Sequence, residues 1–277
     1  MRSIRLPSGE CVPALGMGTW RIGDDFRNRS AEIATLRLGL DLGMKLIDTA
    51  EMYGEGKAEE LIGEAIQDRR DDAFIVSKVY PHNASQAAMA KSCEASLRRL
   101  GTDRIDLYLL HWMGSVPISE VIEGFIKLQK AGKIRYFGVS NLDTEEMEAL
   151  WKLPGGQGTA ANQVLYNLTR RGIEFDLLPW CRKHHLPLMA YSPLEEGALV
   201  RDTKLLAFSR KHGITPAHAA LAWLLAQDEV IVIPKVGKVA HLKENFEAAN
   251  QRLTPEQLAE LSSLFPAPRK KGPLEMI

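Results

Sequence analysis

The sequence predicts an α/β fold, a (β/α)8 TIM barrel that spans residues 1–277 as a single domain. Short apolar, β-rich runs recur eight times, and a stretch with helical periodicity follows each run. The composition does not change along the chain, and no linker rich in Pro, Gly or Ser divides it. The length of 277 residues suits one such barrel, which typically needs about 250 residues. An open, doubly wound sheet is the alternative architecture.

The eight predicted strands are nearly continuous in apolar residues, which is typical of parallel strands buried on both faces. They are Ala14–Thr19, Lys45–Ala50, Phe74–Val79, Asp106–Trp112, Tyr136–Asn141, Ala161–Tyr166, Leu186–Pro193 and Val230–Lys235. Ahead of them, Ile4–Leu6 and Cys11–Ala14 flank Pro7-Ser8-Gly9-Glu10. This pattern predicts a small N-terminal β-hairpin that plugs the N-terminal mouth of the barrel.

Helix boundaries are marked by capping residues. We predict that Ser30 caps the first helix and that Ser85 caps the third, which ends at Gly101. Asp143 and Glu146 have the spacing of a capping box. These signals place helices between the predicted strands.

Two extra helices are predicted near the C-terminus. Thr215-Pro216 places a cap and then a proline at the first helical position, and Thr254-Pro255-Glu256-Gln257 repeats this and completes a capping box. The last helix is expected over Pro255–Leu264, and a helix over His241–Asn250 precedes it. The Pro-rich tail from Phe265 to Ile277 is expected to be irregular.

The bulk composition excludes several classes of protein. Hydrophobic residues make up 45% and charged residues 25% of the chain, and 35 basic residues balance 35 acidic ones. Because no basic excess is present, we expect no nucleic-acid partner. No signal peptide or membrane span is evident, and three well-separated cysteines suit a reducing cytoplasm. Nothing in the sequence demands more than a monomer.

Ionisable residues stand where three neighbouring strands end. Asp48 closes the second strand, with Tyr53 just beyond it on the loop. Lys78 closes the third strand, and His111 the fourth. Because a barrel gathers its reactive groups at the C-terminal ends of its strands, these four side chains are expected to meet.

The four residues form a consistent acid relay. A carbonyl that accepts hydride develops negative charge on oxygen and needs a proton donor, for which Tyr53 is the candidate. The Lys78 ammonium lowers the pKa of the Tyr53 phenol, and Asp48 keeps the buried lysine charged. His111 hydrogen-bonds and orients the substrate oxygen. Taken singly, each residue also has a structural explanation: a helix cap, a packed ring, a solvated charge or a structural histidine. Only their joint placement favours catalysis.

At these residues the chain resembles the aldo-keto reductase superfamily, and it is most similar to short bacterial members that include enzymes reducing methylglyoxal. The resemblance runs nearly from end to end. The matching segments are Gly16–Trp20, Leu38–Ile66, Phe74–Val79, Cys93–Trp112, Gly132–Asn141, Asn162–Asn167, Met189–Leu194 and Ile233–Lys235. The family implies hydride transfer from a bound NAD(P)H to a carbonyl carbon. Its catalytic tetrad falls on Asp48, Tyr53, Lys78 and His111.

The resemblance also implies a cofactor site. Ser140, Asn141 and Gln163 would hold the nicotinamide carboxamide, Tyr191 would stack on the ring, and Lys235 would meet the adenosine 2′-phosphate. The remaining positions that it implies are Gly18, Thr19, Trp20, Asp48, Ser192, Pro193, Leu194, Ile233, Pro234, Val236, Gly237, His241, Glu244 and Asn245. The substrate would contact Trp20, Tyr53, His111 and Trp112. No metal is expected.

Two departures from the family pattern bear on cofactor choice. Many members have Ser where this chain has Val236, and Arg where it has His241. Arginine grips a phosphate with a bidentate fork, which a neutral histidine cannot do. Lys235 still favours NADPH, with modest selectivity and some use of NADH.

Two short loops bear on substrate choice. The segments after the fourth and seventh strands, Met113–Val116 and Glu195–Asp202, are brief. An open, shallow pocket holds its substrate weakly and selects poorly. Small aldehydes, α-ketoaldehydes such as methylglyoxal and simple diketones are therefore the expected substrates.

Two other functions compete with a reductase. A nucleotide-bound regulatory or auxiliary subunit would bind NADP(H) and turn over little, but the retained Tyr53 and Lys78 argue against it. A metal-dependent hydrolase or lyase would need several converging ligands, and Asp48 and His111 alone fall short of that set. Cys181, His184 and His185 hint at a metal site, but no second ligand cluster accompanies them.

Overall fold

A computed structural model describes all residues from 1 to 277 and contains one large parallel sheet. The sheet has eight strands in chain order, with every neighbouring pair parallel. The strands are β3 (Met17–Gly18), β4 (Leu46–Asp48), β5 (Phe74–Val79), β6 (Ile105–Leu110), β7 (Ile134–Ser140), β8 (Thr159–Leu165), β9 (Leu188–Tyr191) and β10 (Val230–Val232). Each predicted strand is present.

Backbone hydrogen bonds between the first and last strands close the sheet into a barrel. Leu15 pairs with Val232 and Gly18 with Lys235, both in the parallel sense. The Gly18 amide donates to the Pro234 carbonyl at 2.8 Å. A Cβ on Gly18 would lie 2.9 Å from the Ile233 carbonyl oxygen, so only glycine permits this approach. The predicted (β/α)8 barrel is confirmed, and the open doubly wound sheet is excluded.

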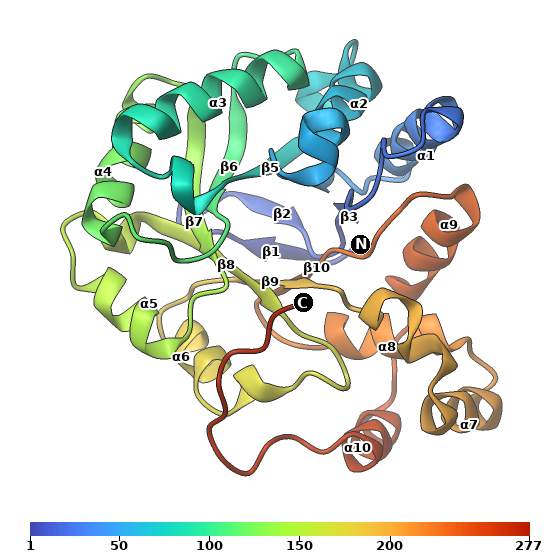
Figure 1. Ribbon diagram of the computed structural model, residues 1–277. Coiled ribbons are helices and arrows are strands. Elements are labelled where there is room, and N and C mark those ends of the chain that lie inside the picture. The colour runs from blue at the N-terminus through green and yellow to red at the C-terminus, as the bar shows by residue number, and fades with distance from the viewer.

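Ten helices surround the barrel (Figure 1). They are α1 (Arg29–Asp41), α2 (Lys57–Ile66), α3 (Gln86–Leu100), α4 (Ile118–Lys130), α5 (Thr144–Trp151), α6 (Leu177–Lys183), α7 (Thr203–His212), α8 (Pro216–Leu225), α9 (Val239–Ala248) and α10 (Pro255–Leu264). Their number is two more than a minimal barrel requires, as predicted. The last predicted helix has the expected bounds, whereas α9 lies two residues earlier than expected. None of the helices combines the length and the apolar character that a membrane-spanning segment requires.

Most of the predicted caps are confirmed, and one is wrong. Asp143 and Thr254 each form a complete capping box, and Gly101 ends α3 in the left-handed conformation. Ser85 occupies the cap position of α3 without a side-chain hydrogen bond. The prediction for Ser30 is incorrect, because the short 3₁₀ helix Phe26–Asn28 runs directly into α1 and leaves Ser30 within its first turn.

The N-terminal hairpin plugs the barrel, as predicted. Strands β1 (Ser3–Arg5) and β2 (Cys11–Pro13) pair antiparallel. The side chains of Ile4, Leu6 and Val12 pack in one buried cluster with residues from inside the barrel, such as Leu107 and Ile231. This apolar filling occupies the N-terminal half of the barrel, so the space for polar groups lies at the other mouth.

The alternation of side chains along each strand decides which residues reach that mouth. Leu46, Val76 and Leu109 belong to the interior cluster. Residues two positions further along a strand point to the same side. Asp48, Lys78 and His111 therefore face the inside of the barrel at its C-terminal end, immediately above the apolar filling.

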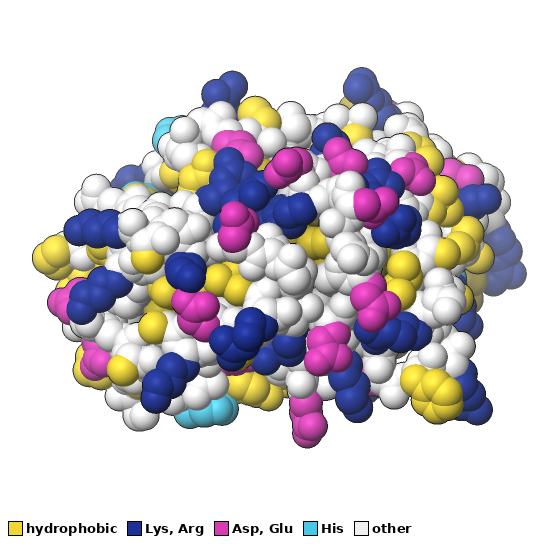
Figure 2. Space-filling model, turned by 90° about the horizontal axis from the view of Figure 1, so that it is seen from above, with side chains coloured by type: hydrophobic (Ala, Val, Ile, Leu, Met, Phe, Trp, Pro, Cys, Tyr) yellow, Lys and Arg dark blue, Asp and Glu magenta, His cyan; other side chains and the backbone are white.

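Basic and acidic side chains are interspersed over the face of the molecule shown in Figure 2, without a large patch of either sign. This distribution agrees with the balanced composition of 35 basic and 35 acidic residues.

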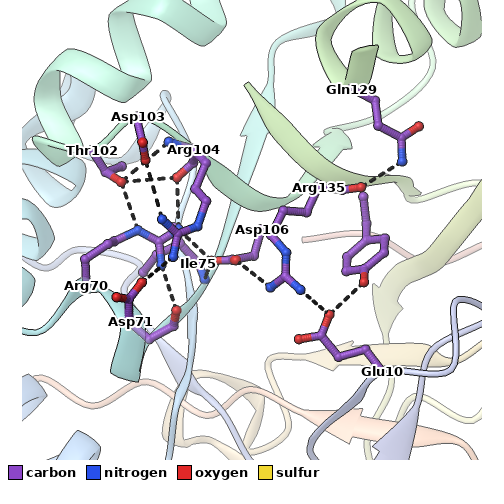
Figure 3. Close-up of polar contacts among 12 residues, drawn as sticks. Glu10, Arg70, Asp71, Ile75, Thr102, Asp103, Arg104, Asp106, Gln129 and Arg135 are labelled. Carbon is purple, nitrogen blue, oxygen red and sulfur yellow. Dashed lines mark hydrogen bonds and ion pairs between the residues drawn. The ribbon is translucent and has the colours of Figure 1, made fainter. Parts of the chain in front are cut away.

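An ion-pair network fastens the N-terminal end of the barrel (Figure 3). Asp106, at the start of β6, has a side chain that is only 2% exposed. Its carboxylate accepts hydrogen bonds from Arg70 at 2.7 Å, Arg135 at 3.0 Å and the Ile75 amide at 2.8 Å. Arg135 also contacts Glu10 of the hairpin at 2.6 Å. One buried carboxylate thus links strands β5, β6 and β7 to the plug.

We expect Asp106→Ala to destabilise the fold substantially. The change removes the acceptor of a buried amide and the partner that two guanidinium groups share, so the free energy of unfolding should fall by about 3 kcal/mol. Urea denaturation followed by circular dichroism measures the loss. Asp103→Ala is the matched control, because the Asp103 side chain is 87% exposed beside Arg104 and such a pair contributes little. Equal urea midpoints for the two variants would contradict the role given to Asp106.

Candidate active site

The four residues of the predicted acid relay meet at the C-terminal mouth of the barrel. Lys78 Nζ lies 2.9 Å from both carboxylate oxygens of Asp48 and 3.1 Å from the Tyr53 hydroxyl. It also donates to the Thr49 carbonyl oxygen at 2.8 Å. The Tyr53 and His111 rings are 6.1 Å apart, centroid to centroid. The sequence did not single out Thr49, since its contact is made by a backbone atom.

Lys78 is fully buried and yet keeps its charge. Burial alone would lower the pKa of this ammonium, but the Asp48 carboxylate and Tyr53 outweigh burial and raise the pKa above its usual value. A buried charge persists when it is paired and its protons are hydrogen-bonded. The ammonium therefore provides a fixed positive charge beside the Tyr53 hydroxyl.

The net pKa of Tyr53 runs against the sequence-based expectation. The Lys78 ammonium does lower the pKa of the phenol, but burial raises it by more, and Asp48 adds to the rise. The phenol is consequently protonated across the neutral range. An alkoxide is a stronger base than a phenolate, so a phenol with a raised pKa can still protonate the oxygen formed by hydride transfer.

His111 is neutral and available to a ligand. Burial, helped by the nearby Lys78 charge, lowers the pKa of the imidazole to about 3. Its Nδ1 atom is buried and has no hydrogen-bond partner. Because a neutral imidazole carries one N–H, we place the proton on Nε2, where a carbonyl oxygen could accept it.

The loop that carries Tyr53 is built from unusual backbone conformations. Gly54, Glu55 and Gly56 all have positive φ angles, of 58°, 56° and 95°. A Cβ on Gly56 would approach Arg99 Cδ to 2.5 Å. Arg99 in turn contacts the buried Glu59 at 2.7 Å. The turn after β4 therefore packs directly on α2 and α3, which limits the positions that the Tyr53 ring can adopt.

A chain of hydrogen bonds joins the tetrad to the predicted nicotinamide site. Gln163 Nε2 donates to Asp48 Oδ1 at 2.7 Å, and Ser140 Oγ donates to the Gln163 carbonyl oxygen at 2.8 Å. Asn141 Nδ2 donates to the His111 carbonyl oxygen at 3.1 Å. The Tyr191 hydroxyl donates to Asn141 Oδ1 at 3.0 Å. The polar groups expected to hold the carboxamide thus lie beside the tetrad.

The C-terminal edge of β10 has the donor set that a phosphate requires. Lys235 is exposed, and α9 follows it with no side chain capping its N-terminal amides. Free amides at a helix N-terminus bind anions. His241 is exposed on the first turn of α9, whereas Val236 is buried. These residues fit a nucleotide phosphate.

The other predicted cofactor residues differ in their exposure to solvent. Gly18, Thr19, Pro193, Ile233, Pro234 and Asn245 are buried, whereas Ser192, Leu194 and Gly237 are partly exposed. Glu244 accepts a hydrogen bond from the Thr215 hydroxyl at 2.8 Å, and the Asn245 amide reaches the Lys235 carbonyl oxygen at 3.4 Å.

Aromatic rings surround the reactive hydroxyl. Trp20 packs edge-on against Tyr53 at a centroid distance of 5.0 Å, and Trp112 lies 4.7 Å from His111. Tyr80 joins this wall, 5.8 Å from Trp112 and 6.4 Å from His111. Sequence reasoning missed Tyr80, although its place directly after β5 could have indicated it.

His184, one of the residues that hinted at a metal site in the sequence, has a packing role. His184 stacks on Trp180 at 4.1 Å, and its Nδ1 lies 2.8 Å from the Trp180 carbonyl oxygen. Cys181 is buried. No group of three or more His, Cys, Asp or Glu side chains in the structure could hold a metal ion.

A closed barrel with these four residues at its C-terminal mouth defines the class of protein, and comparison with known proteins gives its family. The Aldo/keto reductase family matches residues 14–265. Methylglyoxal reductase YeaE of Escherichia coli is 46% identical over 281 residues, covering 100% of this chain and 99% of that protein. A crystal structure of an aldo-keto reductase from Klebsiella pneumoniae in complex with NADPH has a TM-score of 0.97 and 47% identity, covering 100% of this chain and 99% of the other.

Glyoxal reductase of Bacillus subtilis is 31% identical over 267 residues, covering 95% of this chain and 92% of that protein. The chain belongs to the aldo/keto reductase family, and the resemblance seen in the sequence is confirmed.

The neutral His111 predicts an acid-sensitive fold. Its pKa is about 3 in the folded protein and about 6.5 in an unfolded chain, so the unfolded state binds more protons between these values. Stability is therefore lost as the pH falls below about 6.5. Between pH 7 and pH 5, wild type should lose about 2 kcal/mol more free energy of unfolding than His111→Gln. Parallel losses in urea titrations at both pH values would refute the assignment.

Proposed function

We propose that the protein is an NADPH-dependent oxidoreductase that reduces the carbonyl groups of small aldehydes and ketones to alcohols. The observation that carries this proposal is the 3.1 Å contact between the Lys78 ammonium and the Tyr53 hydroxyl. The same ammonium also donates a hydrogen bond to the Asp48 carboxylate at 2.9 Å. A buried phenol that is hydrogen-bonded to a permanent cation is suited to releasing its proton when a neighbouring oxygen becomes negative.

The proposed reaction divides its work between the cofactor and the protein. The bound dihydronicotinamide supplies a hydride to the carbonyl carbon. Tyr53 gives its proton to the carbonyl oxygen, and the Lys78 ammonium stabilises the phenolate that remains. Asp48 holds Lys78 in its charged form, while His111 donates a hydrogen bond that orients the oxygen beside Tyr53. Solvent then returns a proton to Tyr53.

NADPH is the proposed cofactor, with some use of NADH. The relative from Klebsiella pneumoniae binds NADPH in its crystal structure. In this chain, Asn141 and Gln163 would hold the carboxamide, and Tyr191 would stack on the ring. Lys235 and the uncapped start of α9 would meet the 2′-phosphate. His241 stands where an arginine would bind that phosphate more strongly, so the preference for NADPH should be modest.

Small, reactive carbonyl compounds such as methylglyoxal are the proposed substrates. Two relatives are named for the reduction of methylglyoxal and glyoxal. Trp20 remains 37% exposed beside Tyr53, which indicates a pocket that is open to solvent on this side. A pocket of this kind gives a bulky substrate few contacts and leaves small carbonyls to be selected by their reactivity.

The alternative of an auxiliary subunit has no support. A protein that only binds NADP(H) does not need a buried lysine, which costs free energy unless it is paired. All four catalytic groups are present and in contact with one another or close by. We further propose that the enzyme acts in the cytoplasm, since Cys11, Cys93 and Cys181 are unpaired, and that it acts as a single-domain monomer.

The first test removes the proton donor. In Tyr53→Phe, the ring still packs on Trp20 but has no hydroxyl, so turnover should fall by about 10²- to 10⁴-fold while the Kd for NADPH changes less than about twofold. NADPH oxidation is followed by absorbance against a panel of aldehydes, α-ketoaldehydes and sugars, with NADH in parallel. Tyr136→Phe, which loses a hydroxyl at the opposite end of the barrel, is the control. Near-wild-type turnover of Tyr53→Phe would remove the basis of the mechanism.

The second test concerns the 2′-phosphate. His241→Arg adds a bidentate cation on the first turn of α9, so it should tighten NADPH binding about three- to tenfold and leave NADH binding nearly unchanged. Both dissociation constants are measured by quenching of intrinsic fluorescence, with His241→Gln as the uncharged control. An unchanged ratio of the two constants would place the 2′-phosphate elsewhere.

A further inference from the structure

Arg170 binds two segments that are far apart in the chain. It lies in the turn after β8, where its backbone pairs with Asn167. Its Nε atom donates to Glu195 Oε1 at 2.8 Å, and its Nη2 lies 2.7 Å from the same oxygen. Its Nη1 donates to Glu275 Oε1 at 2.8 Å. One guanidinium group thus connects the loop after β9 with the C-terminal tail.

The loop after β9 needs such support. Ser192, Glu195 and Glu196 have positive φ angles of 47°, 51° and 49°. Non-glycine residues adopt this region at a cost in free energy and stay there only when their surroundings hold them. The second Glu195 oxygen is bound as well, since Asn167 Nδ2 donates to it at 2.6 Å and to the Ser192 carbonyl oxygen at 3.0 Å. Arg170 and Asn167 together therefore satisfy both oxygens of the Glu195 carboxylate.

The tail runs from α10 past α6 and ends near β9 (Figure 1). Lys271 fastens the first part of the tail to Glu145 at 2.8 Å and to Asp176 at 3.4 Å. Glu275 then contacts Arg170. The C-terminus thus lies near the end of β9 (Figure 1).

We propose that Arg170 is a positioning residue that couples the C-terminal tail to the loop after β9, so that NADPH binding stabilises the position of the tail. This inference rests on the proposed function and on the cofactor positions Ser192, Pro193 and Leu194, which the family resemblance implies. Arg170 touches neither the tetrad nor the proposed phosphate positions, and it acts through Glu195 on one side and Glu275 on the other. By thermodynamic linkage, loosening the tail at Glu275 must weaken NADPH binding, although Glu275 does not contact the cofactor.

Three variants test the coupling. Arg170→Met keeps the apolar stem but loses both contacts, and should raise the Kd for NADPH about fivefold, which corresponds to about 1 kcal/mol. Glu275→Ala should raise it about threefold, with no further effect in the Arg170→Met background. Lys271→Ala is the matched control, since it frees the tail from α5 and α6 only, and its Kd should stay within about twofold of wild type. The Kd is measured by fluorescence quenching without substrate.

Two further measurements distinguish coupling from general loosening. NADPH should slow hydrogen exchange of the amides in residues 265–277 in wild type and not in Arg170→Met. The KM for NADPH should rise in Arg170→Met while kcat changes less, and Arg170→Lys should restore part of the loss.

A wild-type Kd for NADPH in Glu275→Ala would overturn the coupling but not the cofactor proposal. The same would follow if Lys271→Ala weakened NADPH binding as much as Glu275→Ala does. Failure of the wild-type protein to bind NADPH would overturn the cofactor proposal, and the coupling with it.

Discussion

The contact between Lys78 and Asp48 is the constraint to which the rest of the site conforms. An ammonium with no exposed surface is tolerated inside a protein only if a counter-charge and acceptors surround it. Two carboxylate oxygens, a backbone carbonyl and a phenol hydroxyl supply that surrounding. Each of these acceptors comes from β4 or from the loop after it. The strand pair β4–β5 therefore has to be in register before the site can exist, and the barrel provides that register.

The same contact explains why the polar groups form one connected system. Asp48 accepts from Gln163 as well as from Lys78, and this bond joins β4 to β8 across the barrel mouth. Asn141, with a φ angle of 59°, directs its amide toward His111 and Tyr191. A buried polar network is stable when its members are satisfied, and the hydrogen bonds among Asp48, Lys78 and Gln163 pair these groups with one another. These bonds hold the polar side chains together at the barrel mouth, where the nicotinamide and the carbonyl would meet.

Local patterns in the chain were sufficient to predict the architecture. Each apolar run became a strand, and the capping boxes at Asp143 and Thr254 formed as expected, because both signals depend on residues close in sequence. Ser30 failed as a cap because a 3₁₀ turn, set by Asp25 binding the Arg27 amide, extended the helix at its start. The tetrad could be predicted, since strand ends converge in a barrel. The net rise in the pKa of Tyr53 could not, because burial depends on neighbours such as Trp20 that only the folded chain brings close.

The two ends of the barrel use charge for different purposes. At the N-terminal end, Asp106 joins Arg70 and Arg135, and the hairpin is fastened through Glu10. These pairs connect elements whose backbones are already regular. At the C-terminal end, charged side chains hold conformations that the backbone would otherwise leave, such as the loop around Ser192 and Glu195. Strained backbone conformations persist only while their surroundings hold them, so a ligand that contacts the loop can shift their population. The same kind of ion pair therefore fixes one end of the molecule and leaves the other end responsive to what it binds.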